Sequence, residues 1–390
     1  MRRMAAQVPP LDIRKKRFGQ PVTRLPFLYS RTRCDNPASS QYRPTPLKRT
    51  FDLNAKKSSA ETSPSRLVIH DLAQRNGHAE FSQDVRAGLT SNPRHLFPKY
   101  LYDELGSRLF EAICEVDEYY PTRAEDEILK THAEEIAGCL PTSDTLIELG
   151  SGSAEKTRRL IEAFTRQRQE LLFIPVDISP TALATSAQAL LGSYPNLRIE
   201  AYAADYYQAL AALPDFGPHP VLVLFLGSNI GNFEPPEARR FLHAIRRVLR
   251  PHDVLLLGAD LKKDRQTLEA AYNDALGVTR AFIVNELARI NRELDANFDL
   301  WAFGLRSSYN EAMGRVEVSL ESLRAQSVNI RALDLTIDLA AGEKIHVENA
   351  YKYDLDDLRT LGNETGFALE RTWLDSAERF SSNLFRVTDL

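Results

Sequence analysis

The 390-residue sequence has few cysteines, no long apolar run and little net charge, and each shortage excludes a class of protein. Its three cysteines, Cys34, Cys114 and Cys139, are far apart and follow no metal-ligand spacing. The longest apolar runs, near 221–227 and 254–258, are too short to span a membrane. A net charge of −4 gives no basic field that would favour nucleic acid. We therefore expect a cytoplasmic protein with no metal site and no membrane or nucleic-acid partner.

Residues 1–65 differ in composition from the rest of the chain. The first 50 residues carry many arginines and lysines, several prolines and only two acids, Asp12 and Asp35. Without a helical or strand period, such a segment is typical of disorder. An organelle transit peptide would also be rich in arginine, but no clear amphipathic helix is present. A misassigned start codon is an equal alternative. We predict a disordered basic tail over 1–65.

Residues 145–157 predict a strand, a glycine turn and a helix. Leu146 to Leu149 read as a short buried strand, Gly150 and Gly152 break it, and a helix should begin near Ser153. Glycines let the backbone approach a ligand closely, and a helix N-terminus offers unpaired N–H groups. The third glycine of the dinucleotide fingerprint is missing, so the turn alone indicates only a nucleotide-type ligand.

Strands and helices alternate after this turn. The apolar runs 172–176, 198–202, 221–226 and 254–258 read as further strands, with helices between them. This alternation predicts a doubly wound parallel sheet. Asp177 stands at the end of the second strand, where such folds bind ribose hydroxyls.

Two segments interrupt or precede this pattern. The stretch from Leu67 to Cys139 looks mostly helical, including a helix over 100–116 and another that starts at a capping box on Thr122. Residues 261–294 look like one long helix, and strand-like alternation follows up to residue 353. A last helix and a closing strand pair should complete the sheet. We therefore predict an insertion over about 262–353.

Six stretches of this sequence together resemble the histidine Nα-methyltransferases of ergothioneine biosynthesis. They occur in the family's order and extend over about residues 80 to 390: 100–110, 118–123, 148–158, 227–232, 271–274 and 348–353. The resemblance implies an α/β fold: a Rossmann-like class I methyltransferase sheet with a second, α+β substrate-binding domain. The domains would be 124–261 plus 354–390 for the methyltransferase part, and 66–123 plus 262–353 for the substrate part.

The resemblance also implies S-adenosylmethionine as the cofactor. By motif, its binding residues would be Gly150, Lys156, Asp177, Asp205 and Tyr206. Asp177 would bind the ribose hydroxyls, while Asp205 and Tyr206 would lie beside the adenine. For Asp177 the alternative is a simple cap at the end of its strand.

The substrate would be a small-molecule amino acid. Tyr119, Asn232 and Tyr272 would bind its backbone, Glu348 would bind an imidazole, and Tyr102 would lie near the amine. Tyr102 and Asn232 are thus the candidate catalytic residues. The alternatives are a buried tyrosine with a satisfied hydroxyl, an asparagine in a turn and a solvated carboxylate. Because a sulfonium methyl is already electrophilic, positioning of the amine can supply most of the catalysis, roughly 7–11 kcal/mol at best.

Two positions depart from the family pattern. Ala350 stands where a serine that contacts the imidazole is usual, and Val318 replaces a methionine, so the pocket should be wider. Histidine remains the expected substrate, to be converted to its trimethylated betaine, hercynine. Another aromatic amino acid such as tryptophan is the first alternative. A nicotinamide-dependent oxidoreductase and a non-catalytic binding protein are the remaining ones.

Overall fold

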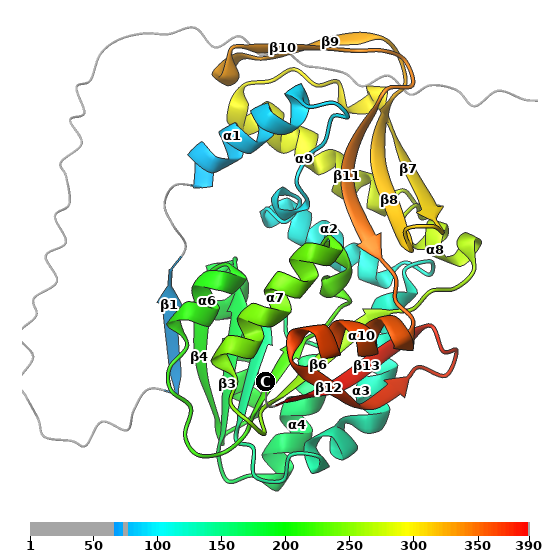
Figure 1. Ribbon diagram of the computed structural model, residues 1–390. Coiled ribbons are helices and arrows are strands. Elements are labelled where there is room, and N and C mark those ends of the chain that lie inside the picture. The colour runs from blue at the N-terminus through cyan, green and yellow to red at the C-terminus, as the bar shows by residue number, and fades with distance from the viewer. Residues whose placement is uncertain (1–65, 73–76, 389–390) are drawn as a thin grey trace, which may run out of the picture. The chain divides into compact units, whose positions relative to one another are not determined.

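A computed structural model describes residues 66–72 and 77–388 (Figure 1). Its largest element is an eight-stranded sheet in which β1 to β6 are parallel, while β13 and β12 complete one edge in antiparallel fashion. In spatial order the strands are β1 (Leu67–Asp71), β4 (Leu197–Ala203), β3 (Leu171–Asp177), β2 (Thr145–Leu149), β5 (Val221–Phe225), β6 (Val254–Asp260), β13 (Phe380–Val387) and β12 (Phe367–Leu374). The predicted parallel sheet and closing strand pair are confirmed.

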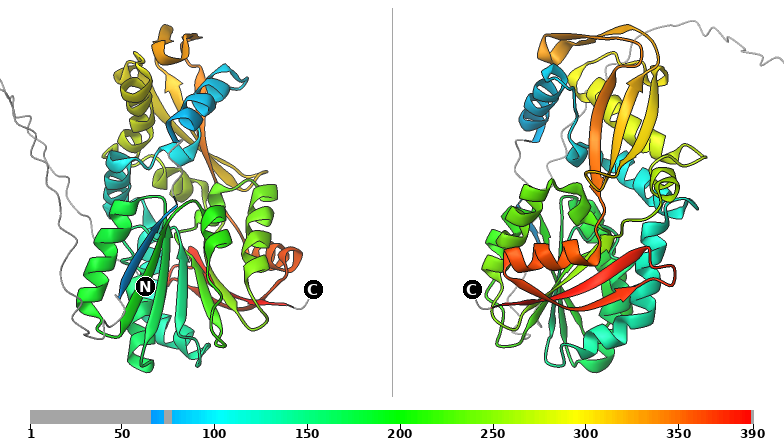
Figure 2. Two further views of the ribbon diagram at one scale, coloured as in Figure 1. Left: turned by 90° about the vertical axis from the view of Figure 1, so that its left-hand side faces the viewer. Right: turned by 45° about the vertical axis from the view of Figure 1, so that its right-hand side comes forward.

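Helices cover both faces of this sheet (Figure 2). One layer consists of α3 (Tyr120–Gly138), α4 (Thr157–Gln167) and α5 (Pro180–Ser193), and the other of α6 (Tyr206–Ala212), α7 (Pro235–Val248) and α10 (Leu355–Thr365). Successive strand residues belong to opposite cores: Leu146 packs with the first layer, and Ile147 with the second. Burial on both faces explains why the strands read as uninterrupted apolar runs.

A second apolar core lies in the insertion and the helices that precede the sheet. Its antiparallel sheet has the order β11 (Lys344–Tyr351), β8 (Arg315–Ser322), β7 (Phe303–Asn310), and a separate hairpin joins β9 (Gln326–Ile330) to β10 (Leu335–Leu339). The helices are α1 (Gly77–Thr90), α2 (Glu104–Glu115), α8 (Arg265–Ala271) and α9 (Val278–Leu294). Short 3₁₀ turns complete the set: η1 (Pro98–Tyr100), η2 (Asn229–Asn232), η3 (Leu300–Ala302) and η4 (Arg331–Leu333).

Residues 67–71 were expected to be helical and to belong to the substrate-binding domain, and both expectations are wrong. They form β1, which pairs in parallel with β4 at the edge of the large sheet. Several helices separate this strand in sequence from the other strands of the sheet, so the alternation of strands and helices does not predict it. The predicted tail, 1–65, lies outside the described residues.

Three helix boundaries also differ from the prediction. Helix α3 begins at Tyr120, not at Thr122, because Pro121 occupies its first turn, where a missing N–H costs nothing. The long helix expected over 261–294 is two helices, and Gly277 with φ +77° begins the second. Helix α4 starts only at Thr157, since the turn after β2 is longer than expected. None of the described helices is long and apolar enough to cross a membrane.

Candidate functional site

The carboxyl ends of β2, β3 and β4 form one polar edge of the large sheet. The backbone N–H groups of Gly150 and Ser151 both donate to the carbonyl of Val176, at 2.8 and 3.0 Å. Gly150 has φ +80°, and a Cβ there would lie 2.9 Å from the hydroxyl oxygen of Tyr206. Glycine is therefore required both for the turn and for the close approach of Tyr206. Gly150 and Tyr206, both predicted cofactor residues, are neighbours in space.

The two predicted cofactor acids also organise the backbone at this edge. Asp177 accepts the N–H of Gly152 and the N–H of Ser179, each at 2.9 Å. Asp205 accepts two backbone N–H groups of α6 in a capping box, at 2.8 and 2.9 Å. Asp177 therefore does cap the end of its strand, which was the alternative to cofactor binding. Binding of ribose hydroxyls would be a second role for the same carboxylate. Both carboxylates lie at the ends of neighbouring strands and remain at least partly exposed.

Lys156 is paired with a buried acid that the sequence analysis missed. Its ammonium contacts Glu125 on α3, and both carboxylate oxygens of Glu125 accept the N–H of Gly227 at 2.9 Å. A Cβ at Gly258 on β6 would lie 2.1 Å from Glu125, so this glycine makes room for the carboxylate. Glu125 therefore connects α3, the turn after β5 and the predicted cofactor lysine. Only its place inside an amphipathic helix, among apolar residues, could have drawn attention to it.

Glu148, at the end of β2, is a second buried acid below the glycine turn. The hydroxyls of Ser151 and Thr157 both donate to its carboxylate, the first at 2.9 Å. Burial raises the pKa of Glu148 to about 7, and the two hydroxyl contacts oppose that shift. The carboxyl is satisfied within the fold and does not line the cavity described next.

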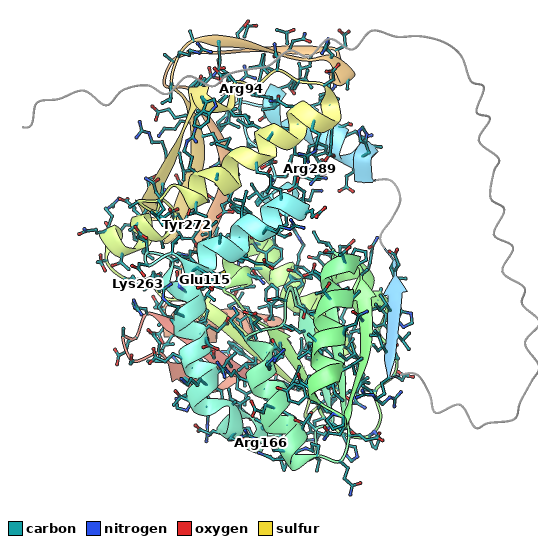
Figure 3. All side chains as sticks on the ribbon, turned by 180° about the vertical axis from the view of Figure 1, so that it is seen from behind. Arg94, Glu115, Arg166, Lys263, Tyr272 and Arg289 are labelled. Carbon is teal, nitrogen blue, oxygen red and sulfur yellow. The ribbon has the colours of Figure 1, made fainter. Side chains whose placement is uncertain are left out.

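All seven predicted substrate residues line one cavity, between the turn after β5 and the insertion. They are Tyr102, Tyr119, Asn232, Tyr272, Val318, Glu348 and Ala350. They come from elements far apart in the chain, and Tyr272 lies where the insertion meets the large sheet (Figure 3). Asn232 is exposed, and none of the described residues makes a hydrogen bond with its amide. The cofactor residues of the sheet edge are not part of this lining.

Aromatic rings form one wall of the cavity. Tyr102 packs edge to face on Phe110 and Phe282, with ring centroids 5.6 and 5.3 Å apart, and Tyr119 packs in the same way on Tyr272 at 6.3 Å. Burial raises the pKa values of Tyr102 and Tyr119 well above the usual range. Their hydroxyls are therefore protonated and able to donate hydrogen bonds.

A β-bulge sets the direction of Glu348. The pairing of β11 with β8 shifts between His346 and Glu348, so that Glu348 lies opposite Val318. Val347, the extra residue, is buried, and Glu348 faces the cavity directly after it. Burial raises the pKa of Glu348 to about 7, and no hydrogen bond from a described residue reaches its carboxylate. This acid thus differs from Glu148: its hydrogen-bonding capacity is left for a ligand.

A buried ion pair also belongs to the lining of this cavity. Lys352 donates to Asp260 at 2.9 Å and to the hydroxyl of Tyr272 at 2.8 Å. Asp260 also accepts from Tyr120 at 2.7 Å and from Lys263 at 2.6 Å. No role was expected for Lys352 or Tyr120 from the sequence, although both lie within the stretches that carry the family resemblance. Asp260 carried no signal beyond its position at the end of a strand. Within the described residues, no group of three or more acidic, histidine or cysteine side chains could hold a metal ion.

Comparisons with known proteins identify a family of methyltransferases. The profile of a family described as histidine-specific, S-adenosylmethionine-dependent methyltransferase matches residues 81–387. A histidine N-alpha-methyltransferase of Mycolicibacterium smegmatis is 42% identical, over 80% of this chain and 97% of its own length. One of Mycobacterium tuberculosis is 41% identical, over 81% and 98%. A more distant relative, a 4-dimethylallyltryptophan N-methyltransferase of Claviceps purpurea, is 28% identical, over 77% and 93%.

Proposed function

The chain belongs to the family of histidine-specific, S-adenosylmethionine-dependent methyltransferases, and from that premise we propose that it methylates the α-amino nitrogen of L-histidine. The product after three transfers would be trimethylhistidine, hercynine, on the route to ergothioneine. The single observation that carries the proposal is the cavity in which a carboxyl group and several protonated tyrosines converge from distant elements. The nicotinamide-dependent oxidoreductase considered above is wrong, because the family is one of methyltransferases.

The sheet edge fits the cofactor that this family uses. S-adenosylmethionine, when bound, supplies an electrophilic methyl group on a sulfonium. Because Gly150 has no side chain, its backbone lies close to the Tyr206 hydroxyl. Asp177 and Asp205 offer carboxylate oxygens at neighbouring strand ends. We assign Gly150, Asp177, Asp205 and Tyr206 to cofactor binding. Lys156 would contribute mainly through Glu125, which fixes the turn at Gly227.

The cavity residues would bind and orient histidine. A carboxylate at Glu348 can accept an imidazole N–H in a charge-assisted hydrogen bond. Tyr119, Asn232 and Tyr272 would bind the amino-acid backbone, and Tyr102 would lie beside the amine. The attacking nitrogen needs a free lone pair, so each transfer requires that the ammonium lose one proton first. Because that proton can pass to water, these side chains need only hold the neutral amine in line, and they form no covalent intermediate.

Methyl transfer to each amino acid in turn tests the proposal. The purified protein is incubated with S-adenosylmethionine and single amino acids, and the products are separated by mass. We expect mono-, di- and trimethylated histidine, and a much lower yield from Glu348→Gln. If no amino acid yields a methylated product, the proposal is wrong. Cell fractionation tests the further proposal, based on the sparse cysteines, that the enzyme is cytoplasmic; recovery in an organelle would contradict it.

Tryptophan is a second candidate substrate, favoured by the small residues opposite the aromatic wall. Val318 and Ala350 are both almost fully buried on adjacent strands, and neither offers a hydrogen bond to an imidazole. The relative from Claviceps purpurea is named for a tryptophan derivative. The values of kcat/KM for histidine and tryptophan separate the two candidates. A preference for tryptophan that Ala350→Ser reduces would replace histidine as the proposed substrate.

A further inference from the structure

Lys352 is a buried ammonium in the lining of the cavity, four residues after Glu348 in the chain. Its side chain is 1% exposed, and Asp260, its ion-pair partner, is equally buried. Burial alone would lower the pKa of Lys352, but the charge of Asp260 raises that pKa above its ordinary value. The nitrogen therefore keeps all three protons, and an ammonium can only donate hydrogen bonds.

This fixes the direction of one hydrogen bond at Tyr272. Lys352 lies 2.8 Å from the Tyr272 hydroxyl, so the phenol oxygen must be the acceptor. The O–H of Tyr272 then has to donate elsewhere, and among the described residues no acceptor receives it. Tyr272 lines the cavity, and burial raises its pKa, so the hydroxyl keeps its proton. It therefore presents a hydrogen-bond donor to whatever lies in the cavity.

Of the α-amino and α-carboxyl groups of an amino acid, only one is a suitable partner for this donor. An ammonium group has no lone pair, and the lone pair of a neutral amine must stay free to attack the methyl group. The α-carboxylate accepts hydrogen bonds strongly, and more so when the donor is already polarised by a cation. We propose that Lys352 is a positioning residue: by donating to Tyr272 it commits the Tyr272 hydroxyl to the substrate α-carboxylate.

The enzyme would then select α-amino acids with a free carboxylate over the corresponding amides and amines. The inference rests on the proposed amino-acid methylation, and what it adds is the residue that orients the Tyr272 hydroxyl, Lys352. Asp260 supports it in two ways: it keeps Lys352 charged, and it fixes the ammonium between itself and the phenol.

The test is the ratio of kcat/KM for histidine to kcat/KM for histidinamide, in which a neutral amide replaces the carboxylate. Both values come from one enzyme preparation, so partial unfolding of a variant cancels from the ratio. We expect Lys352→Met to lower the ratio about 10-fold or more, the usual size for a hydrogen bond to a charged group. Tyr272→Phe should lower it similarly, and the double variant should be no worse than Tyr272→Phe alone. An unchanged ratio in Lys352→Met, or additive losses in the double variant, would overturn the inference.

A neighbouring lysine provides the matched control. Lys262 pairs with Asp354 and Asp357 at the surface, and Lys262→Met should leave the ratio unchanged. If Lys352→Met does not fold, Lys352→Gln replaces it; its amide still donates, so a ratio above that of Tyr272→Phe is expected, and an equal one contradicts the inference. If the wild-type enzyme does not methylate histidine, the proposed function fails separately. Tryptophan and its amide, or affinities of the same pairs measured by calorimetry, then test Lys352.

Discussion

The two halves of the site are built by different means. At the sheet edge the site is formed mainly by backbone groups. Gly150, the carbonyl of Val176 and two capping acids hold a turn through local hydrogen bonds. The substrate cavity is made of side chains from eight helices, turns and strands, and its polarity depends on buried groups such as Lys352 and Glu348. We therefore expect cofactor binding to tolerate few changes of the backbone. The choice of substrate should change when single side chains are substituted.

Glu125 belongs to neither half alone, so its loss should have the largest effect. Glu125→Ala leaves the largely buried Lys156 ammonium without its partner and removes the acceptor of the Gly227 N–H. We expect the free energy of unfolding to fall by about 3–5 kcal/mol in chemical denaturation. Asp126→Ala is the control, since its surface pair with Arg159 should contribute at most about 1 kcal/mol. Equal stability of the two variants would contradict a role for Glu125 as a shared support.

Glu148 should determine how the stability of the sheet edge depends on pH. Its pKa is raised to about 7 in the folded state from 4.5 in the unfolded state, so the folded state binds more protons between these values. Its contribution is therefore fully present below pH 4.5 and is lost as the pH rises through 7, by up to about 3 kcal/mol. Denaturation curves measured over this range should show the decline, and Glu148→Gln should reduce it, leaving the part that Glu348 contributes through its own raised pKa. A decline of unchanged size in Glu148→Gln would assign all of it to other groups.

Glu348, with the same raised pKa, should affect substrate binding as well as stability. Its ionised fraction rises through pH 7, and the ionised form accepts an imidazole N–H more strongly. We expect kcat/KM for histidine in Glu348→Gln to be about 10- to 100-fold below wild type at high pH. The ratio of wild type to variant should grow from pH 6 to 8 and then level off. A ratio independent of pH would place the imidazole elsewhere. Using the ratio cancels deprotonation of the substrate amine.

Gly150→Ala should affect the cofactor half alone. A side chain at φ +80° is strained by about 1–3 kcal/mol, and its Cβ would crowd the Tyr206 hydroxyl. We expect affinity for S-adenosylmethionine, measured by calorimetry, to fall about 10-fold or more. In Gly138→Ala, where a Cβ would meet nothing within 4 Å, the affinity should be unchanged. Equal affinity in both variants would show that the turn does not approach the cofactor.

The smallest expected effect belongs to Ala350→Ser in the substrate half. The added hydroxyl would stand on the strand of Glu348 and could contact an imidazole for about 0.5–1.5 kcal/mol. We expect KM for histidine to fall up to about 10-fold, with little change in cofactor affinity. A KM that rises instead would show that the pocket has no room for the hydroxyl.

The fold was predictable wherever short-range pattern determines structure. The buried runs of β2, β5 and β6 and the glycine turn each follow from a few consecutive residues. β1 escaped prediction because its pairing with β4 is determined by packing across more than a hundred residues. The start of α3 was misread because Pro121 is compatible both with a break before a helix and with its first turn.

The candidate site, like the fold, could be predicted from the sequence only in part. The resemblance identified the seven side chains that line the cavity, although no local pattern could bring residues 102 and 348 together. It did not reveal Glu125, Asp260 or the function of Lys352, because these groups act through contacts with other side chains. The bulge at Val347 was also invisible, since one extra residue hardly disturbs a strand pattern yet reverses which face the following residues occupy.

Helix α3 places two of these contacts on one rigid segment. Tyr119 precedes its first turn at the substrate cavity, and Glu125 follows within two turns, where it contacts Lys156 and the turn at Gly227. A helix of this length does not stretch, so the distance between the amino-acid pocket and the cofactor turn is fixed by a few residues of one element. A substitution that moves one end of this helical segment therefore also moves the other end. Substrate range in this enzyme can therefore change through the far wall of the cavity, on β8 and β11, while the spacing needed for methyl transfer is preserved.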